Sequence, residues 1–121
     1  SRGGTVDAGT MTDGLQLERE HDGAHVVLTL RGEIDMTTIA VLSHALDDAA
    51  TTAGDVWVDL TAVEFMDSTG LNTLARAHSV LAGDARRLVV MCPGKGAVRR
   101  ALEVSGLDGV LTLVTSRGAV A

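Results

Sequence analysis

Aromatic residues are scarce in this chain of 121 residues, which has one tryptophan, one phenylalanine and no tyrosine. Proteins that bind single-stranded nucleic acid stack the bases on aromatic side chains, so this composition argues against such a platform. Basic residues are also too few, because 16 acidic residues outnumber 10 lysines and arginines and give a formal net charge of −6. A phosphate backbone attracts a basic surface, so we expect no direct binding to nucleic acid.

Cysteine and long apolar runs are nearly absent as well. The single cysteine, Cys92, allows no internal disulfide and fits a reducing cytoplasm. His21, His25 and His44 show no metal-ligand spacing, which with a lone cysteine argues against a zinc site. No apolar run approaches the roughly 20 residues that span a bilayer, and no secretory signal opens the sequence. We therefore expect a cytoplasmic protein that has no metal, no cofactor and no membrane contact.

The length and a hydrophobic content of 45% favour one domain with one core. We expect this domain over residues 13–115. The small, glycine-rich start predicts an N-terminal tail over residues 1–12 that is flexible or left over from cloning. The last residues, 116–121, are predicted to be a flexible C-terminus.

Hydrophobic periodicity predicts strands that alternate with helices. Asp22 and Gly23 form a favourable hairpin turn, so the first two strands should be antiparallel. Each later strand–helix–strand unit should join parallel strands. The predicted fold is α/β, with a mixed, mostly parallel five-stranded sheet, an antiparallel edge strand and about three packing helices. The strands are expected at 15–20, 26–30, 56–60, 88–92 and 110–114, and the helices around 39–49, 69–81 and 95–105.

The strongest functional signal follows the third predicted strand. Residues 67–71 read Asp-Ser-Thr-Gly-Leu and open the second helix, so the hydroxyl of Ser68 should lie at a helix N-terminus beside Asp67. The free N–H groups and partial positive charge of a helix N-terminus tolerate an added phosphate. An exposed serine there suits a phosphate-controlled switch. The same local sequence also fits a simple helix cap, because Asp and Ser are favoured as caps.

Three short motifs carry a resemblance to a known family. Residues 32–35 (Gly-Glu-Ile-Asp), 67–71 and 105–107 (Ser-Gly-Leu) occur in this order between Leu15 and Val114. With this spacing the chain resembles the STAS domain and, more closely, the bacterial anti-sigma factor antagonists. STAS domains have an α/β architecture, which agrees with the periodicity.

The resemblance implies a function and partners. Antagonists of this family bind an anti-sigma factor serine kinase that uses ATP, and so release a sigma factor for transcription in stress-response or sporulation-type signalling. The kinase inactivates them by phosphorylating a serine, which is Ser68 here, and a phosphatase restores them. ATP and Mg²⁺ would belong to the kinase. Asp67 would orient the hydroxyl of Ser68 or contact the partner.

The candidate site is expected at the ends of two predicted strands. In open α/β sheets, sites form where strands end and helices begin. The loops that contain Asp35 and Asp67 both meet this description, so these carboxylates and Ser68 should share one patch. Thr69 is the competing phosphate acceptor or a second helix cap. Further docking candidates on the outward side of the second helix are Asn72, Thr73 and Arg76.

Other interpretations have weaker support. A serine hydrolase elbow needs Gly-x-Ser-x-Gly, but Met66 stands at the first glycine and no histidine is placed as the base, so we expect no catalytic residue. Residues 94–96 (Gly-Lys-Gly) lack the rest of a phosphate-binding loop. The main alternative is a STAS docking module, or a small-ligand or nucleotide-binding module, in another signalling or transport assembly and without a phosphate switch.

Overall fold

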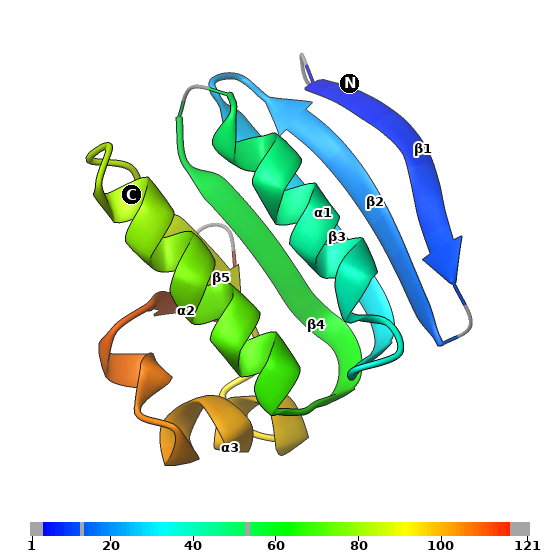
Figure 1. The fold of residues 1–121 in the computed structure, drawn as a ribbon, viewed down its shortest axis with the longest axis vertical. Coiled ribbons are helices and arrows are strands. Elements are labelled where there is room, and N and C mark those ends of the chain that lie inside the picture. The colour runs from blue at the N-terminus through cyan, green and yellow to red at the C-terminus, as the bar shows by residue number, and fades with distance from the viewer. Residues whose placement is uncertain (1–3, 13, 53, 117–121) are drawn as a thin grey trace.

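The structure is a computed structural model that describes residues 4–12, 14–52 and 54–116. Across these residues, the chain forms one sheet whose six strands lie in sequence order (Figure 1). The strands are β1 (Gly4–Thr12), β2 (Leu15–Asp22), β3 (His25–Ile34), β4 (Val56–Met66), β5 (Leu88–Met91) and β6 (Thr112–Val114). The helices are α1 (Ile39–Ala50), α2 (Ser68–Ala82) and α3 (Ala97–Val104), with a short 3-10 turn, η1 (Leu107–Gly109).

The predicted strands and helices are all present, as β2 to β6 and α1 to α3, so the predicted fold class is confirmed. β2 and β3 are antiparallel and are joined by the predicted hairpin, in which Asp22 pairs with His25 and Gly23 has a φ of 66°. β3, β4, β5 and β6 are parallel neighbours. No helix in the described part of the chain is long and apolar enough to cross a membrane.

The structure differs from the prediction at the N-terminus. Residues 4–12, expected to be a tail outside the fold, form β1 and pair antiparallel with β2, from Gly4 opposite Asp22 to Thr12 opposite Leu15. The physical reason is that β2 would otherwise leave a row of backbone N–H and C=O groups unpaired at the sheet edge. The sheet thus has one strand more than predicted. Residues 1–3 and 117–121 lie outside the described residues, and the domain bounds of 13–115 stay a prediction.

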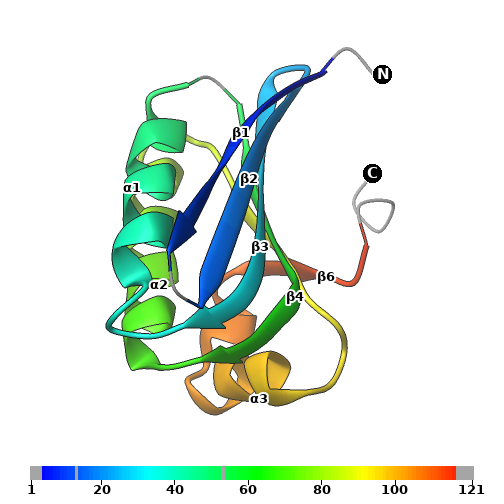
Figure 2. The ribbon, with the colours of Figure 1, turned by 90° about the vertical axis from the view of Figure 1, so that its right-hand side faces the viewer.

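α1 and α2 pack on one face of the sheet, and α3 packs near one end of it. Figures 1 and 2 show α1 and α2 side by side on this face, with α3 at the lower end of the molecule. Every helix contributes to the same core as alternate residues of the strands, because successive strand side chains point to opposite faces. The helix residues at its centre are Leu42, Leu46, Leu74, Leu81, Val98 and Leu102. A smaller apolar cluster consists of Val27, Trp57, Val89, Met91 and Val114.

The register of β3 and β4 positions the two loops of interest. Ile34 and Met66, the last residues of these strands, are paired, and the N–H of Asp67 donates to the carbonyl of Ile34 at 3.0 Å. β5 ends much earlier, where Met91 pairs with Asp59. The β3–α1 and β4–α2 loops therefore leave the same sheet edge next to each other.

Candidate functional site

The predicted meeting of the two loops is present. Asp35 directly follows Ile34, and Asp67 directly follows Met66, the residue paired with Ile34. The carboxylates of Asp35 and Asp67 therefore belong to neighbouring loops at one edge of the sheet. Both residues are half-buried, and each is held by a different local network of hydrogen bonds.

Asp67 is the N-cap of α2. Its Oδ1 accepts hydrogen bonds from the backbone N–H of Thr69 at 2.9 Å and from the Thr69 hydroxyl at 2.5 Å. Its carbonyl accepts from the N–H groups of Gly70 at 3.1 Å and Leu71 at 3.2 Å. A short carboxylate side chain is well suited to this position, which explains why the helix begins here.

Ser68 is the first residue of α2 and is exposed. Its hydroxyl makes no hydrogen bond to any residue that the structure describes. The cap is Asp67, so the interpretation of Ser68 as the helix cap has no support in the geometry. The resemblance implied that Asp67 would orient the Ser68 hydroxyl or contact the partner. The structure does not show the first role, because Asp67 binds the hydroxyl of Thr69 instead. Ser68 therefore presents an accessible hydroxyl at the positive end of a helix.

Asp35 organises the turn before α1. Its Oδ1 accepts from the N–H of Thr37 at 2.9 Å and from the Thr37 hydroxyl at 2.7 Å. These hydrogen bonds, the one from the Thr37 hydroxyl first, hold the pKa of Asp35 below its ordinary value. The N-cap of α1 is Thr38, which is buried and whose hydroxyl donates to the carbonyl of Glu33 at 2.9 Å. Asp35 thus fixes the turn and presents a negative charge at neutral pH.

Close packing around position 70 explains why the motif has a glycine there. A Cβ at this position would lie 2.5 Å from Cγ of Met66 and 2.9 Å from Cγ2 of Ile34. The absence of a side chain therefore lets the first turn of α2 lie against the ends of both β3 and β4. Motif residues 67–70 supply, in order, a cap, an exposed hydroxyl, a hydroxyl bound to the cap and a close packing contact.

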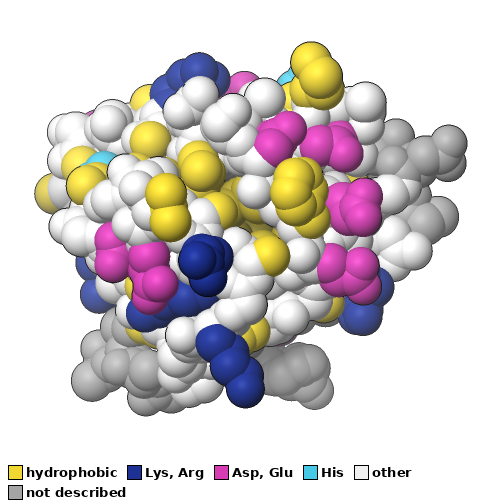
Figure 3. All heavy atoms as spheres, turned by 90° about the horizontal axis from the view of Figure 1, so that it is seen from below, with side chains coloured by type: hydrophobic (Ala, Val, Ile, Leu, Met, Phe, Trp, Pro, Cys, Tyr) yellow, Lys and Arg dark blue, Asp and Glu magenta, His cyan; other side chains and the backbone are white. Residues whose placement is uncertain are grey.

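Two exposed apolar residues near this patch were missed by the sequence reasoning. Met36, which follows Asp35, is 75% exposed, and Phe65, near the end of β4, is 47% exposed. Glu33 and Glu64 are also exposed in the same two segments. Figure 3 views this end of the molecule and shows apolar side chains in the middle, with a larger group of acidic side chains on the right, a smaller one on the left, and Lys and Arg side chains below the centre. The available signal was an apolar residue within two positions of each predicted site carboxylate, Met36 beside Asp35 and Phe65 two residues before Asp67.

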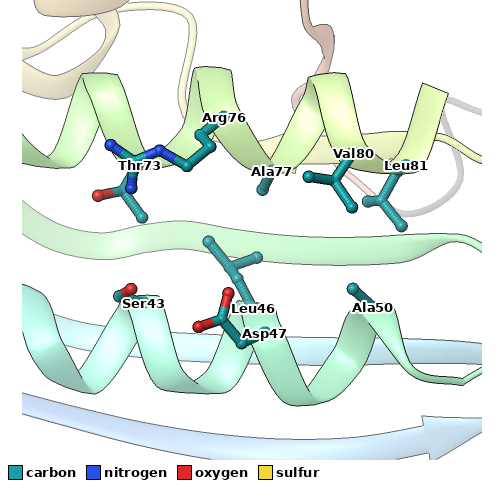
Figure 4. A pocket seen from close by; sticks show the side chains of 9 residues that line it. All are labelled: Ser43, Leu46, Asp47, Ala50, Thr73, Arg76, Ala77, Val80 and Leu81. Carbon is teal, nitrogen blue, oxygen red and sulfur yellow. The ribbon is translucent and has the colours of Figure 1, made fainter. Parts of the chain in front are cut away.

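The docking candidates on α2 separate into two groups. Asn72 and Arg76 are exposed as expected, but Thr73, also expected on the outward side, is buried. The reason is that α2 packs against both the sheet and α1, so more of its surface is covered than a single apolar stripe predicts. Figure 4 shows Thr73 and Arg76 beside a small cavity between α2 and α1, with Asp47 on the opposite side.

Arg76 lies away from Ser68, the candidate phosphate acceptor. It is two turns beyond Ser68, a distance of about 12 Å along the helix axis. The residues that the structure brings together around the strand ends are Asp35, Asp67, Ser68 and Thr69, with Asn72 one turn further along α2. Among the described residues no three His, Cys, Asp or Glu side chains are grouped so that they could hold a metal ion.

Comparison with known proteins identifies related chains. The family model described as "Mlab, STAS domain" matches residues 17–115. The chain is 36% identical over 98 residues to the anti-sigma-F factor antagonist RsfB of Mycobacterium tuberculosis, covering 80% of this chain and 78% of RsfB. It is 31% identical over 101 residues to the anti-sigma-B factor antagonist of Listeria monocytogenes, covering 83% of this chain and 88% of that protein.

A solved structure is similar over nearly the whole chain. The crystal structure of an anti-sigma factor antagonist from Mycobacterium paratuberculosis superposes with a TM-score of 0.80 at 30% sequence identity. The match covers 91% of this chain and 93% of that one. Sequence and fold therefore lead to the same group of proteins.

Proposed function

Because the chain belongs to the STAS domain family, and within it to the anti-sigma factor antagonists, we propose that it binds an anti-sigma factor kinase and that phosphorylation of Ser68 ends this binding. Binding of the kinase would free a sigma factor and so permit transcription. The chain would act in the cytoplasm, where sigma factors work, and by binding rather than by catalysis. A phosphatase that removes phosphate from Ser68 would return it to the active form.

The observation that supports this proposal best is the state of the Ser68 hydroxyl. It is exposed, unbonded among the described residues, and directly follows Asp67, whose loop lies beside the loop that carries Asp35. A kinase can reach such a hydroxyl without unfolding the helix. The kinase, together with its own ATP and Mg²⁺, would transfer the γ-phosphoryl group to Oγ of Ser68, with release of ADP and the hydroxyl proton.

The modification should leave the fold unchanged. The hydroxyl of Ser68 has no role in the cap, because Asp67 receives the capping hydrogen bonds, so a phosphate displaces no internal hydrogen bond. The N-terminus of α2 also offsets part of the added negative charge. Phosphorylated and unphosphorylated forms should thus differ in surface charge and shape.

The surface change is large enough to abolish docking. A phosphoserine adds about 1.5 to 2 negative charges and three acceptor oxygens beside two existing carboxylates. Like charges brought together in an interface cost several kcal/mol, and each ~1.4 kcal/mol is a tenfold loss of affinity. A partner surface that fits the bare serine therefore meets both bulk and repulsion after phosphorylation.

The test is affinity capture from a lysate of the source organism with the wild-type chain and Ser68→Ala as baits, with and without Mg-ATP. Phosphopeptide mapping of the bait follows. We expect both baits to capture an ATP-binding anti-sigma factor, and Mg-ATP to release it only from the wild type, with phosphate on Ser68. Ser79→Ala is the matched control, because Ser79 is also an exposed serine of α2, three turns from Ser68.

Equal capture by both baits, with no phosphate on either, would contradict the switch. In that case the alternative would hold, and the chain would be a STAS docking module in another signalling or transport assembly. Stabilisation of the isolated chain against heat by a nucleotide or another small molecule would instead favour a ligand-binding module.

A further inference from the structure

Among the side chains that the structure describes, the large apolar ones are mostly buried, and Met36 is the most exposed of those with long side chains. Met36 is 75% exposed and Phe65 is 47% exposed, whereas the other exposed apolar residues among those described are valines. Phe65 is one of only two aromatic residues in the chain, and the other, Trp57, is buried. Met and aromatic residues are enriched in protein interfaces, so an exposed pair of this kind is informative.

We propose that Met36 and Phe65 are the apolar anchors that hold the partner at the Ser68 face and determine which anti-sigma factor is bound. This proposal rests on the proposed function and extends it. The phosphate on Ser68 would decide whether binding occurs, and the two anchors would decide with which protein and how tightly. Neither residue belongs to the motif that predicted the site.

The backbone places both anchors close to Ser68. Met36 lies two residues beyond Ile34, Phe65 lies one residue before Met66, and Ile34 pairs with Met66. From strand spacing and the reach of the chain, the Cα atoms of Met36 and Phe65 are at most ~15 Å apart. An interface of standard size covers about 800 Å² per partner, so one partner can cover both anchors and Ser68.

The backbone at both anchors is fixed before binding. Met36 lies between Asp35 and Thr37, inside the turn that the Asp35 carboxylate closes with hydrogen bonds of 2.7 and 2.9 Å. Phe65 belongs to β4 and pairs with Glu33 of β3. Presenting an apolar side chain from a fixed backbone lowers the conformational entropy lost on association, which favours affinity.

The charges around the anchors define the partner's chemistry. Asp35 is next to Met36 in the sequence, Glu64 is next to Phe65, Asp67 lies two residues beyond Phe65, and Glu33 pairs with Phe65. None of these carboxylates forms an ion pair with the described residues. Figure 3 shows that acidic side chains border the apolar area at one side of this end of the molecule, with Lys and Arg side chains at another. The matching surface is an apolar pocket bordered by lysine or arginine side chains. We therefore expect an anti-sigma factor with such a pocket to be selected.

The experiment measures binding kinetics of Met36→Ala and Phe65→Ala with the purified anti-sigma factor that the Ser68→Ala bait captures. We expect each change to raise Kd at least ~10-fold, mainly through faster dissociation. Met36→Leu should stay close to wild type, because it keeps apolar volume. Val80→Ala is the matched control, since Val80 is 54% exposed and three turns along α2 from Ser68, and its Kd should not change.

A second arm tests the charged border. Glu33→Gln and Glu64→Gln should slow association severalfold at low salt and leave dissociation nearly unchanged. Tryptophan fluorescence during urea unfolding checks that every variant is folded.

If the wild type binds and the Kd values of Met36→Ala and Phe65→Ala stay within twofold of it, the anchor proposal is overturned. The proposed function would still stand. Absence of binding by both wild type and Ser68→Ala would instead reject the proposed function itself.

Discussion

The carboxylate of Asp67 binds both the backbone N–H and the hydroxyl of Thr69, at 2.9 and 2.5 Å, while the hydroxyl of Ser68 has no hydrogen bond among the described residues. Two adjacent hydroxyls therefore differ in their availability. The Thr69 hydroxyl must break a short, charge-assisted hydrogen bond before it can react, whereas the Ser68 hydroxyl is exposed. This difference separates two residues that the sequence alone treats as alternatives for phosphorylation.

The first prediction is that phosphate is found on Ser68 and not on Thr69. Thr69→Ala should still be phosphorylated by the captured kinase, while Ser68→Ala should not. Loss of the Thr69 hydroxyl should cost about 1 kcal/mol of unfolding free energy, as expected for one hydrogen bond. Phosphopeptide mapping measures the first effect and urea unfolding the second. Phosphate on Thr69 in the Ser68→Ala chain would contradict this assignment.

The second prediction separates the two roles of Asp67. Asp67→Ala should lower the unfolding free energy by about 1 kcal/mol, because α2 loses its N-cap. Asp67→Asn keeps an oxygen that can cap the helix, so its stability should stay near wild type. If the charge contacts the partner, both variants should bind the anti-sigma factor more weakly by a similar factor. Normal binding by Asp67→Asn would limit Asp67 to a structural role.

The third prediction concerns a mimic of the phosphorylated state. Ser68→Asp places a negative charge at the N-terminus of α2, which is stabilising by about 0.3 to 1 kcal/mol at low salt. The melting temperature should therefore be equal to or slightly above that of wild type, while binding should be at least ~10-fold weaker through repulsion. A marked drop in melting temperature would show that Ser68 has a structural role that the hydrogen bonds do not reveal.

The fourth prediction concerns Arg86, which stabilises the end of α1 from a distant part of the chain. Its guanidinium donates to the carbonyl of Ala50 at 2.7 Å and to the carbonyl of Thr52. Arg86→Ala should cost about 2 kcal/mol, because these carbonyls lose a charged donor. Arg86→Lys should recover only part of the loss, since an ammonium cannot bridge both carbonyls as a planar fork does.

Arg100 supplies the control for this prediction. It is exposed on α3 and its side chain has no hydrogen bond or ion pair with another described residue, so Arg100→Ala should not change the unfolding free energy. An equal loss of stability in both variants would point to the overall charge instead of the contacts of Arg86.

The fifth prediction is a pH dependence of stability through Asp55. Burial of this carboxyl raises its pKa, but hydrogen bonds and charge from Arg87 outweigh burial and hold the pKa below the ordinary value of 3.8. A lowered pKa in the folded state stabilises the fold above the unfolded-state pKa, and this contribution disappears as pH falls through the folded-state pKa. Wild type should therefore lose stability below pH 3.8.

Asp55→Asn tests the fifth prediction. This variant should be less stable than wild type at pH 7 and should lose less stability on acidification, because its side chain does not titrate. Urea unfolding followed by the fluorescence of Trp57, the only tryptophan, measures both effects. Parallel acid curves for the two proteins would assign the pH dependence to other carboxylates, among them Asp35.

The order of the strands and helices and the location of the two loops could be predicted because each depends on local information, although β3 and β4 end at Ile34 and Met66, four and six residues beyond the predicted ends at 30 and 60. Periods of two and of about 3.6 residues mark strands and helices within a short window, and parallel crossovers bring the strand ends to one edge. The meeting of Asp35 and Asp67 follows from these two facts. The pairing of Ile34 with Met66 confirms this meeting. Predicting it required no knowledge of side-chain packing.

The features that could not be predicted depend on contacts between distant segments. β1 exists because β2 offers an unpaired edge, and nothing in the small residues of 4–12 shows this. Thr73 is buried because α1 lies beside α2, which a single helical stripe does not reveal. Asp67 binds the hydroxyl of Thr69 and not that of Ser68 because of side-chain geometry within one helical turn. The sequence motif alone is compatible with either hydroxyl.

The packing at Gly70 also bears on how such domains diversify during evolution. Any larger residue there would collide with Met66 and Ile34, so a mutation at Gly70 disturbs the junction between helix and sheet. Met36 projects into solvent only a few residues from that junction, and a change there leaves the junction intact. On the proposed roles of Met36 and Ser68, one copy could therefore acquire a new partner after gene duplication by substitution at Met36 while it keeps the proposed phosphorylation site. Several parallel pathways in one cell can then be kept separate by a small number of exposed side chains.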